Sequence, residues 1–298
     1  MADRVSQKIC LPKFLQFPRP MLFKINHFFY WLVFVSINLS NVNANPIAEL
    51  FALKGDSEQT IHLTYKEKGL FGFTDNKLEA IVYLPRETNG KLVLWSHGSV
   101  LNLNQIKVTH RLLPIANEFT NNGYTFVIWM RAGRGKSEGI TEEFSGDDCN
   151  IYKTDASLIR NRDQMSQVIS QLKEKYSLSK VFLIGHSRGG IISANYASHN
   201  PNEISAVINL AGAYNQFCDS KNGMHSYKIV RDSTRFKNQR WIYYKSDTFF
   251  PDSYKNFVRE ITSENNIDFY EPEGNHATPL LGPRWITGAL KWFDSFRN

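Results

Sequence analysis

Ser187 is the residue whose surroundings best fit nucleophilic chemistry. It lies in Gly185-His-Ser-Arg-Gly189, directly after four apolar residues and before a helix-like segment, 191–198. This pattern predicts a nucleophile elbow, in which a buried strand turns sharply into a helix and holds a serine in a strained backbone conformation. The five-residue pattern arises easily by chance, so the interpretation depends on the residues that accompany it.

His276 and Asp247 complete a predicted triad with Ser187. A serine hydroxyl is a poor nucleophile at neutral pH and needs a base within hydrogen-bond distance and a third group that orients the base. His276 follows the last predicted strand, and Asp247 follows a predicted strand that ends at Tyr244. In this interpretation His276 takes the proton from Ser187 and delivers it to the leaving group, while Asp247 fixes the imidazole tautomer.

Other side chains keep alternative interpretations. Asp219 is the alternative acid, because it follows the preceding strand and some triads place the acid there. Asp252 is interpreted as a surface turn residue, and His186 as packing beneath the elbow rather than reacting. Three further histidines lie in predicted strands or helices, where surface or packing roles are expected: His62, His110 and His199.

Two backbone N–H groups are predicted to form the oxyanion hole. Arg188 immediately follows the nucleophile, and Ser99 ends the segment His97-Gly98-Ser99. Each donor aimed at the oxyanion of a tetrahedral intermediate is worth about 10² to 10³ in rate. The side chain of Arg188 is left with two interpretations, a contact with the substrate or a structural ion pair.

An alternation of strands and helices is predicted to position these residues. Two strands with polar and apolar alternation are expected to form an antiparallel start at the sheet edge: 60–65 and 78–84. Buried strands follow at 91–96, 125–130, 181–184, 206–211, 240–244 and 267–270, and helical spacing occurs at 112–119, 165–172, 191–198 and 286–293. This order predicts a mainly parallel sheet covered on both faces, with ligands beyond the carboxyl ends of the strands.

Composition excludes several other functions. The net charge is +7, but five basic residues against one acidic residue account for +4 of it before residue 45, so nucleic-acid binding is not indicated. The glycine-rich segment 131–139 has neither P-loop spacing nor Gly-x-Gly-x-x-Gly, which argues against nucleotide binding. The predicted chemistry needs no metal or organic cofactor.

The first 44 residues are predicted to be an export signal. Basic residues precede the ten-residue apolar run 28–37, and Val42-x-Ala44 is a small-residue cleavage pattern. A membrane span needs about 20 residues, so no stable membrane anchor is expected after cleavage. Met21 gives a more ordinary signal and is the hypothetical true start. The mature chain, 45–298, is then expected in the periplasm or outside the cell.

Export determines how the cysteines are interpreted. Cleavage removes Cys10 and leaves Cys149 and Cys218 in an oxidising compartment. A disulfide between them is predicted, and two unrelated buried thiols are the alternative.

From residue 91 to the C-terminus the chain resembles the α/β-hydrolase superfamily, closest to its lidless dienelactone-hydrolase-like and serine-aminopeptidase-like branches. The motifs that carry this resemblance are His97-Gly98, 131–139, 185–190, Lys245-Ser-Asp247 and Gly274-Asn-His276. The order Ser, Asp, His is also that of the superfamily. Dienelactone hydrolases proper use a cysteine nucleophile, whereas position 187 is serine, so lactone chemistry is not implied.

The connection 213–239 has room for a helix or two but not for a large lid domain. An open pocket suits small or soluble acyl substrates. Its basic residues indicate either an anionic substrate or a solvated helix face: Lys221, Lys228, Arg231, Arg235 and Lys237.

The sequence therefore predicts an exported serine hydrolase that acts on a small-molecule or peptide acyl substrate, with an ester as the first choice. The alternatives are a peptidase or amidase, an acyltransferase, and a non-catalytic binding protein on the same fold.

Overall fold

The computed structural model describes residues 57–69, 72–99, 105–141, 151–214, 225–282 and 284–296. All of them fall within one compact unit, Ala44–Asn298. The predicted export signal lies outside the described residues, as do Cys149, Cys218 and Asp219. No described helix is both long and apolar enough to cross a membrane.

Eight strands form one sheet in the order β1-β2-β4-β3-β5-β6-β7-β8. The strands are β1 (Glu58–Gly69), β2 (Gly72–Tyr83), β3 (Lys91–Ser96), β4 (Thr125–Trp129), β5 (Lys180–His186), β6 (Ala206–Leu210), β7 (Gln239–Ile242) and β8 (Asp268–Tyr270). β2 is antiparallel to both β1 and β4, and every other pair is parallel. The prediction of a mainly parallel α/β-hydrolase sheet is confirmed.

The prediction of two edge strands is correct only for β1. β2 pairs with β1 on one side and with β4 on the other, where Ala80 lies opposite Trp129. The reason lies in the inner half of β2, which is apolar apart from Glu79 and is buried throughout. Glu79 is tolerated there because its carboxylate accepts hydrogen bonds from the Thr109 hydroxyl and the Lys136 backbone N–H, both at 2.8 Å.

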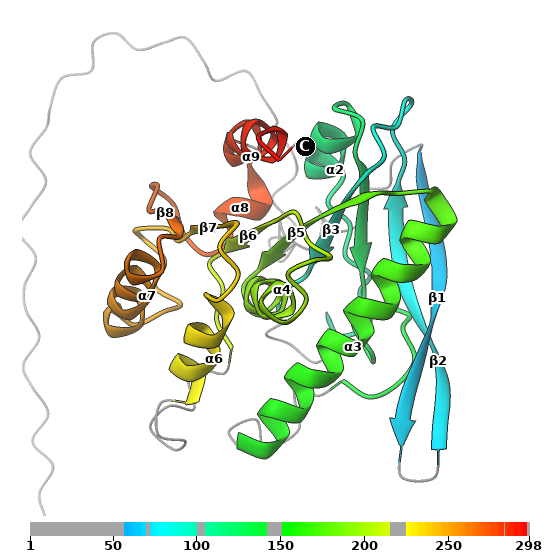
Figure 1. The fold of residues 1–298 in the computed structure, drawn as a ribbon, viewed down its shortest axis with the longest axis horizontal. Coiled ribbons are helices and arrows are strands. Elements are labelled where there is room, and N and C mark those ends of the chain that lie inside the picture. Colours follow the sequence, from blue (N-terminus) through cyan, green and yellow to red (C-terminus); the bar gives the residue numbers. More distant parts are fainter. Residues whose placement is uncertain are drawn as a thin grey trace, which may run out of the picture. The chain divides into compact units, whose positions relative to one another are not determined.

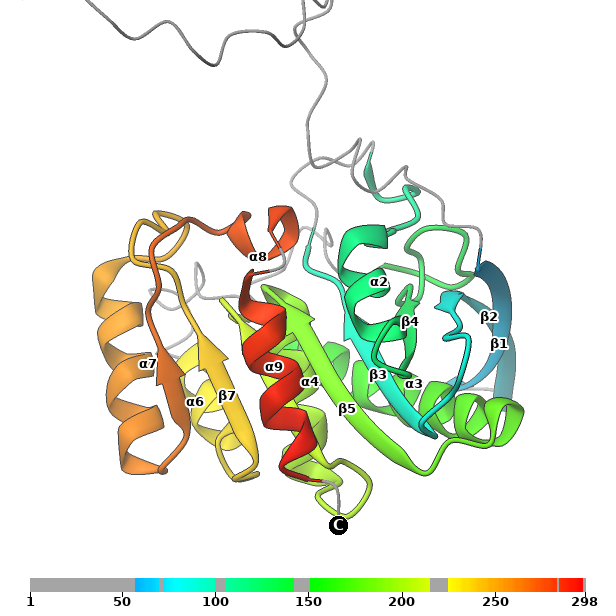
Figure 2. The same cartoon turned by 90° about the horizontal axis from the view of Figure 1, so that it is seen from above.

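Helices cover both faces of the sheet, as predicted (Figure 1). The helices are α2 (Leu113–Thr120), α3 (Ile151–Tyr176), α4 (Arg188–His199), α6 (His225–Ser233), α7 (Asp252–Glu264), α8 (Thr278–Leu281) and α9 (Arg284–Asp294). One core cluster joins the sheet to α3, α4, α6 and α7, and a second joins it to α2 and α9. Figure 2 shows α9 and α2 in front of the central strands.

Two segments differ from the predicted elements or extend them. Asp252 does not lie in a surface turn but is the first residue of α7, where its carboxylate pairs with Lys255 at 3.0 Å. The connection from β6 to β7 contains α6 in its described part, and 215–224 lies outside the described residues.

Every described candidate residue follows the carboxyl end of a parallel strand. Ser99 follows β3, Ser187 follows β5, Asp247 follows β7 and His276 follows β8. Because these ends meet at one edge of the sheet, residues far apart in sequence gather there.

Candidate active site

Ser187 occupies a sharp turn between β5 and α4. Its φ of 55° and ψ of −128° lie in a region that non-glycine residues rarely adopt. Such a conformation costs about 1 to 3 kcal/mol and persists only where the surroundings fix it. Here the Ser187 backbone N–H donates to Leu210 O at 2.9 Å, and the Ser187 carbonyl accepts from Gly190 N at 2.9 Å. The predicted elbow geometry is therefore present.

The glycines on either side of the serine are required by close backbone contacts. A Cβ on Gly185 would lie 2.1 Å from the carbonyl oxygen of Gly189, and a Cβ on Gly189 would lie 2.1 Å from Ser96 O. Neither contact leaves room for a side chain. The two glycines allow β5, α4 and the end of β3 to meet at the turn.

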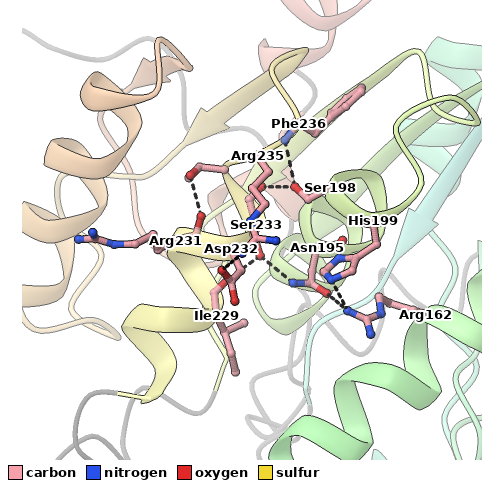
Figure 3. Close-up of polar contacts among 11 residues, drawn as sticks. Arg162, Asn195, Ser198, His199, Ile229, Arg231, Asp232, Ser233, Arg235 and Phe236 are labelled. Carbon is pink, nitrogen blue, oxygen red and sulfur yellow. Dashed lines mark hydrogen bonds and ion pairs between the residues drawn. The ribbon is translucent and has the colours of Figure 1, made fainter.

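The helix that begins at the elbow is fixed at its far end by polar contacts with α6 and α3 (Figure 3). The Ser198 hydroxyl donates to Ser233 O at 2.8 Å, and Asn195 Nδ2 donates to Ser233 Oγ at 3.3 Å. From α3, Arg162 Nη1 donates to Asn195 Oδ1 at 3.1 Å and to His199 Nε2 at 2.9 Å. These contacts hold α4, and with it the backbone of Ser187, against two neighbouring helices.

His276 and Asp247 form a hydrogen-bonded pair. His276 Nδ1 lies 2.8 Å from Asp247 Oδ2, and the other carboxylate oxygen accepts the Phe249 backbone N–H at 2.9 Å. Asp247 is buried. The His276 ring stacks on Phe249 at 4.6 Å between centroids and meets Phe250 edge-on at 5.1 Å. With Nδ1–H directed at the carboxylate, Nε2 is the nitrogen left to accept a proton.

His186 links the His276 loop to the elbow. Its Nε2–H donates to the His276 carbonyl at 2.7 Å, and the two imidazole centroids are 4.7 Å apart. Burial, and then the neighbouring His276, lowers the pKa of His186 to about 3, so its ring is neutral at ordinary pH. The sequence indicated only packing for His186. The link joins positions 90 residues apart, and no local pattern reports such a contact.

His276 lies beside His186, the residue that precedes Ser187, but it is not hydrogen-bonded to the Ser187 hydroxyl. Among the hydrogen bonds of the described residues, none joins Ser187 Oγ to the His276 ring. In enzymes without bound substrate such bonds are often long and tighten when the substrate binds.

The predicted oxyanion loop lies against the nucleophile. A Cβ on Gly98 would be 3.0 Å from Ser187 Cβ, so Gly98 is in direct contact with the elbow. Arg188 is the first residue of α4, where backbone N–H groups have no partner within the helix and the helix dipole favours negative charge. Its N–H is therefore suited to an oxyanion.

The side chain of Arg188 is held by neighbouring protein groups. Its Nε donates to Ser99 Oγ at 2.8 Å, and its guanidinium lies 4.8 Å from the centre of the Tyr214 ring. These contacts, with a hydroxyl and an aromatic ring, favour a structural role for the side chain.

The basic residues of the β6 to β7 connection lie on a solvated face, where described. Lys228, Arg231, Arg235 and Lys237 are exposed, and Lys221 lies outside the described residues. Arg235 pairs with Asp232 at 2.6 Å, and Lys237 donates to Asn265 Oδ1 at 3.0 Å. This arrangement favours the solvated helix face over an anionic-substrate site.

The two large cavities found among the described residues are not at the nucleophile. One of about 970 Å³ is lined by Leu84, Leu113 and Asn117, and one of about 880 Å³ by Tyr244, Tyr270 and Trp285. Neither lining includes Ser187, so neither identifies a substrate. No group of three or more His, Cys, Asp or Glu side chains in the described part of the chain could hold a metal ion.

Comparison with known proteins identifies the family and the fold of the chain. A family model described as serine aminopeptidase, S33, matches residues 93–248, just over half of the chain. No curated protein matches the sequence.

Several solved structures share this fold, and the match covers nearly the whole length of each of them. An α/β serine hydrolase without a lid from Xanthomonas campestris is 16% identical, with a TM-score of 0.50 over 80% of this chain and 97% of that one. A putative dienelactone hydrolase from Klebsiella pneumoniae is 14% identical, with a TM-score of 0.53 over 79% and 99%. Est1E from Butyrivibrio proteoclasticus, solved with ferulic acid bound, is 15% identical, with a TM-score of 0.51 over 73% and 94%. At these identities the likeness concerns the fold alone.

Proposed function

Because the chain belongs to the serine aminopeptidase S33 family of the α/β-hydrolase superfamily, we propose that it hydrolyses carboxylic esters through an acyl-enzyme on Ser187. The observation that carries the proposal is the hydrogen bond of 2.8 Å between His276 Nδ1 and the buried carboxylate of Asp247, at the strand edge where Ser187 is held in its strained turn.

The proposed reaction begins when Ser187 Oγ attacks the ester carbonyl carbon and its proton passes to His276 Nε2. Asp247 stabilises the imidazolium that forms. The oxyanion is stabilised by the backbone N–H groups of Ser99 and Arg188. The intermediate expels the alcohol, which takes the proton from His276, and leaves an acyl-enzyme. Water then attacks the acyl-enzyme with His276 again as the base. This step releases the carboxylic acid and returns the proton to the Ser187 hydroxyl.

The phenylalanines around His276 give the base a partly apolar setting. Phe249 and Phe250 pack on two sides of its ring, which limits the number of ring orientations. Catalytic hydrogen bonds are often absent or long in enzymes without substrate and form when the substrate fills the site. The missing Ser187 to His276 bond is therefore compatible with the proposal.

Peptide hydrolysis is the second candidate, favoured by the description of the family as serine aminopeptidases. The same triad serves esters and amides, and the leaving group is selected by pocket contacts. A panel of nitrophenyl esters, aminoacyl anilides and acyl acceptors separates esterase, peptidase and acyltransferase. We expect the esters to be hydrolysed fastest.

Labelling with a fluorophosphonate probe tests the nucleophile. We expect the wild-type protein to be labelled at Ser187, and Ser187→Ala to abolish both labelling and hydrolysis. Ser193→Ala is the matched control, because Ser193 lies on the same helix, is buried and has an Oγ without a hydrogen-bond partner. Labelling at another residue, or activity in Ser187→Ala, would contradict the proposal and leave a binding function as the alternative.

The acid of the triad is tested by two matched substitutions. We expect Asp247→Asn to lower kcat by about 10⁴, because it removes the partner that fixes the His276 tautomer. Asp219→Asn is expected to leave kcat within about threefold of wild type. The opposite pattern would assign the acid to Asp219.

We also propose export with cleavage after Ala44 and a disulfide between Cys149 and Cys218. The mass and N-terminal sequence of the protein recovered from the periplasm or medium test the first point, and a start well before Asn45 contradicts it. Thiol titration of the denatured mature protein tests the second, and two free thiols refute the bridge.

A further inference from the structure

Arg131 is a buried arginine at the start of the loop after β4, with 3% of its surface exposed. Its guanidinium donates to two successive carbonyl groups of the loop after β3. Nη1 lies 2.5 Å from His97 O, and Nη2 lies 3.3 Å from Gly98 O. The planar fork of an arginine can make both bonds at once, which a lysine ammonium cannot reproduce in the same geometry.

His97 adds a second donor to the Gly98 carbonyl. Its Nδ1 lies 2.8 Å from Gly98 O, and its Nε2 lies 3.4 Å from the Arg131 backbone N–H. These partners assign the proton to Nδ1 and leave Nε2 as an acceptor. Burial, followed by the charges of Arg131 and Arg134, lowers the pKa of His97 well below its ordinary value, which agrees with a neutral ring.

The segment that carries Arg131 is itself fixed to β2. The Ser137 hydroxyl donates to Met130 O at 2.7 Å and accepts from Glu79 N at 2.8 Å. The Glu79 carboxylate accepts the Lys136 backbone N–H at 2.8 Å. Arg131 therefore extends from a rigid loop to the loop that faces the nucleophile.

The direction of the Gly98 carbonyl determines the direction of the next N–H. In a trans peptide the C=O and N–H groups point to opposite sides. Because Gly98 O is turned toward Arg131 and His97, the Ser99 N–H is turned away from them. Gly98 itself touches Ser187, since a Cβ at Gly98 would lie 3.0 Å from Ser187 Cβ.

From this geometry we infer that Arg131 is the positioning residue of the oxyanion hole: it holds the Gly98–Ser99 peptide so that the Ser99 N–H is presented to the developing oxyanion. The catalytic consequence of this inference rests on the proposed ester hydrolysis. The orientation of the peptide can be tested independently of that function.

Paired oxygen and sulfur substrates separate positioning from stability. A thionoester carries sulfur where the oxyanion would form, and sulfur is a weak hydrogen-bond acceptor, so a formed hole favours the oxygen ester. We expect Arg131→Met to lower kcat on a nitrophenyl ester about 10- to 100-fold with KM within about threefold. The ratio of oxygen-ester to thionoester rates should fall at least fivefold. Arg131→Lys, with one donor retained, should fall between wild type and Arg131→Met.

Arg240→Lys is the matched control, because Arg240 also donates to a backbone carbonyl, Gly288 O at 3.2 Å, but lies at the β7–β8 side of the sheet. We expect its rate ratio to equal that of wild type. A ratio that also stays at the wild-type value in both Arg131 variants, with activity lost only in proportion to unfolded protein, would overturn the inference in favour of a purely structural role.

A crystal structure of Arg131→Met, or of Arg131→Lys if the first does not fold, tests the orientation without reference to activity. We expect the Gly98–Ser99 peptide to be rotated from its wild-type direction or to take two orientations. An unchanged peptide overturns the inference even if esters are hydrolysed. If wild-type protein hydrolyses no ester and takes no phosphonate, the proposed function fails, and the structure of the variant still decides the role of Arg131.

Discussion

At the scale of single residues, the predicted site depends on three histidines with different roles. His276 faces the Asp247 carboxylate, His186 holds the His276 carbonyl, and His97 holds the Gly98 carbonyl. The sequence identified His276 because it follows a strand end and has Gly274 two residues before it. It did not assign hydrogen bonds to His186 or His97, because their partners are set by loops that meet only in the folded chain.

His186 provides a test of this division of roles. We expect His186→Leu to lower kcat about tenfold, because the His276 carbonyl loses its donor and the base loses its placement. His186→Gln should retain most of the activity, since its amide N–H can occupy the position of the Nε2–H. Steady-state ester hydrolysis, with thermal unfolding as a check on folding, measures both. An equal loss of kcat in the two variants would show that the hydrogen bond to the His276 carbonyl does not determine the activity.

At the scale of elements, the sequence predicted most strands and the helices that carry a clear apolar stripe. The predicted range of β3 agrees with the structure because Lys91–Ser96 is a short, mostly apolar run before His97-Gly98. α7 was not predicted, although Tyr254, Val258 and Ile261 have helical spacing, because most of its other residues are polar. The inner position of β2 was not predicted either, since its pairing with β4 depends on the order of strands in space.

The contacts between α4 and α6 predict how firmly the elbow helix is held. Ser198 Oγ donates to Ser233 O at 2.8 Å and accepts the Phe236 N–H at 3.1 Å. We expect Ser198→Ala to lower the free energy of unfolding by about 1 to 3 kcal/mol, because the Phe236 N–H loses its acceptor and the Ser233 carbonyl keeps only the donor from Gln239 Nε2. Ser193→Ala on the same helix removes no hydrogen bond and should cost less than about 1 kcal/mol. Denaturant unfolding compares them, and equal costs would refute the role of these contacts.

At the scale of the whole molecule, the two buried neutral histidines make stability depend on acid pH. The pKa of His186 is lowered to about 3, and that of His97 lies well below its ordinary value of 6.5, whereas both titrate near 6.5 in the unfolded chain. Between these values the unfolded state binds more protons, so stability is fully present above about pH 6.5 and is lost as the pH falls toward 3. Each histidine contributes a slope of about 1.4 kcal/mol per pH unit.

Urea unfolding of wild type and His186→Gln at several pH values between 7 and 4 measures this slope. We expect the stability of the variant to fall less steeply, by the equivalent of one proton. Carboxylate titration is common to both proteins and cancels in the difference. Parallel curves would mean that His186 is not held neutral by the fold.

The strand order also places the nucleophile and the base on strands of unequal stability. The nucleophile follows β5, which has β3 on one side and β6 on the other, whereas the base follows β8, a three-residue strand at the outer edge. Short edge strands open most readily in native-state hydrogen exchange, so the amides around residue 270 should lose protection well before those of β5. On mild heating we therefore expect reversible inactivation: His276 leaves the site while the central strands stay folded, and activity returns on cooling.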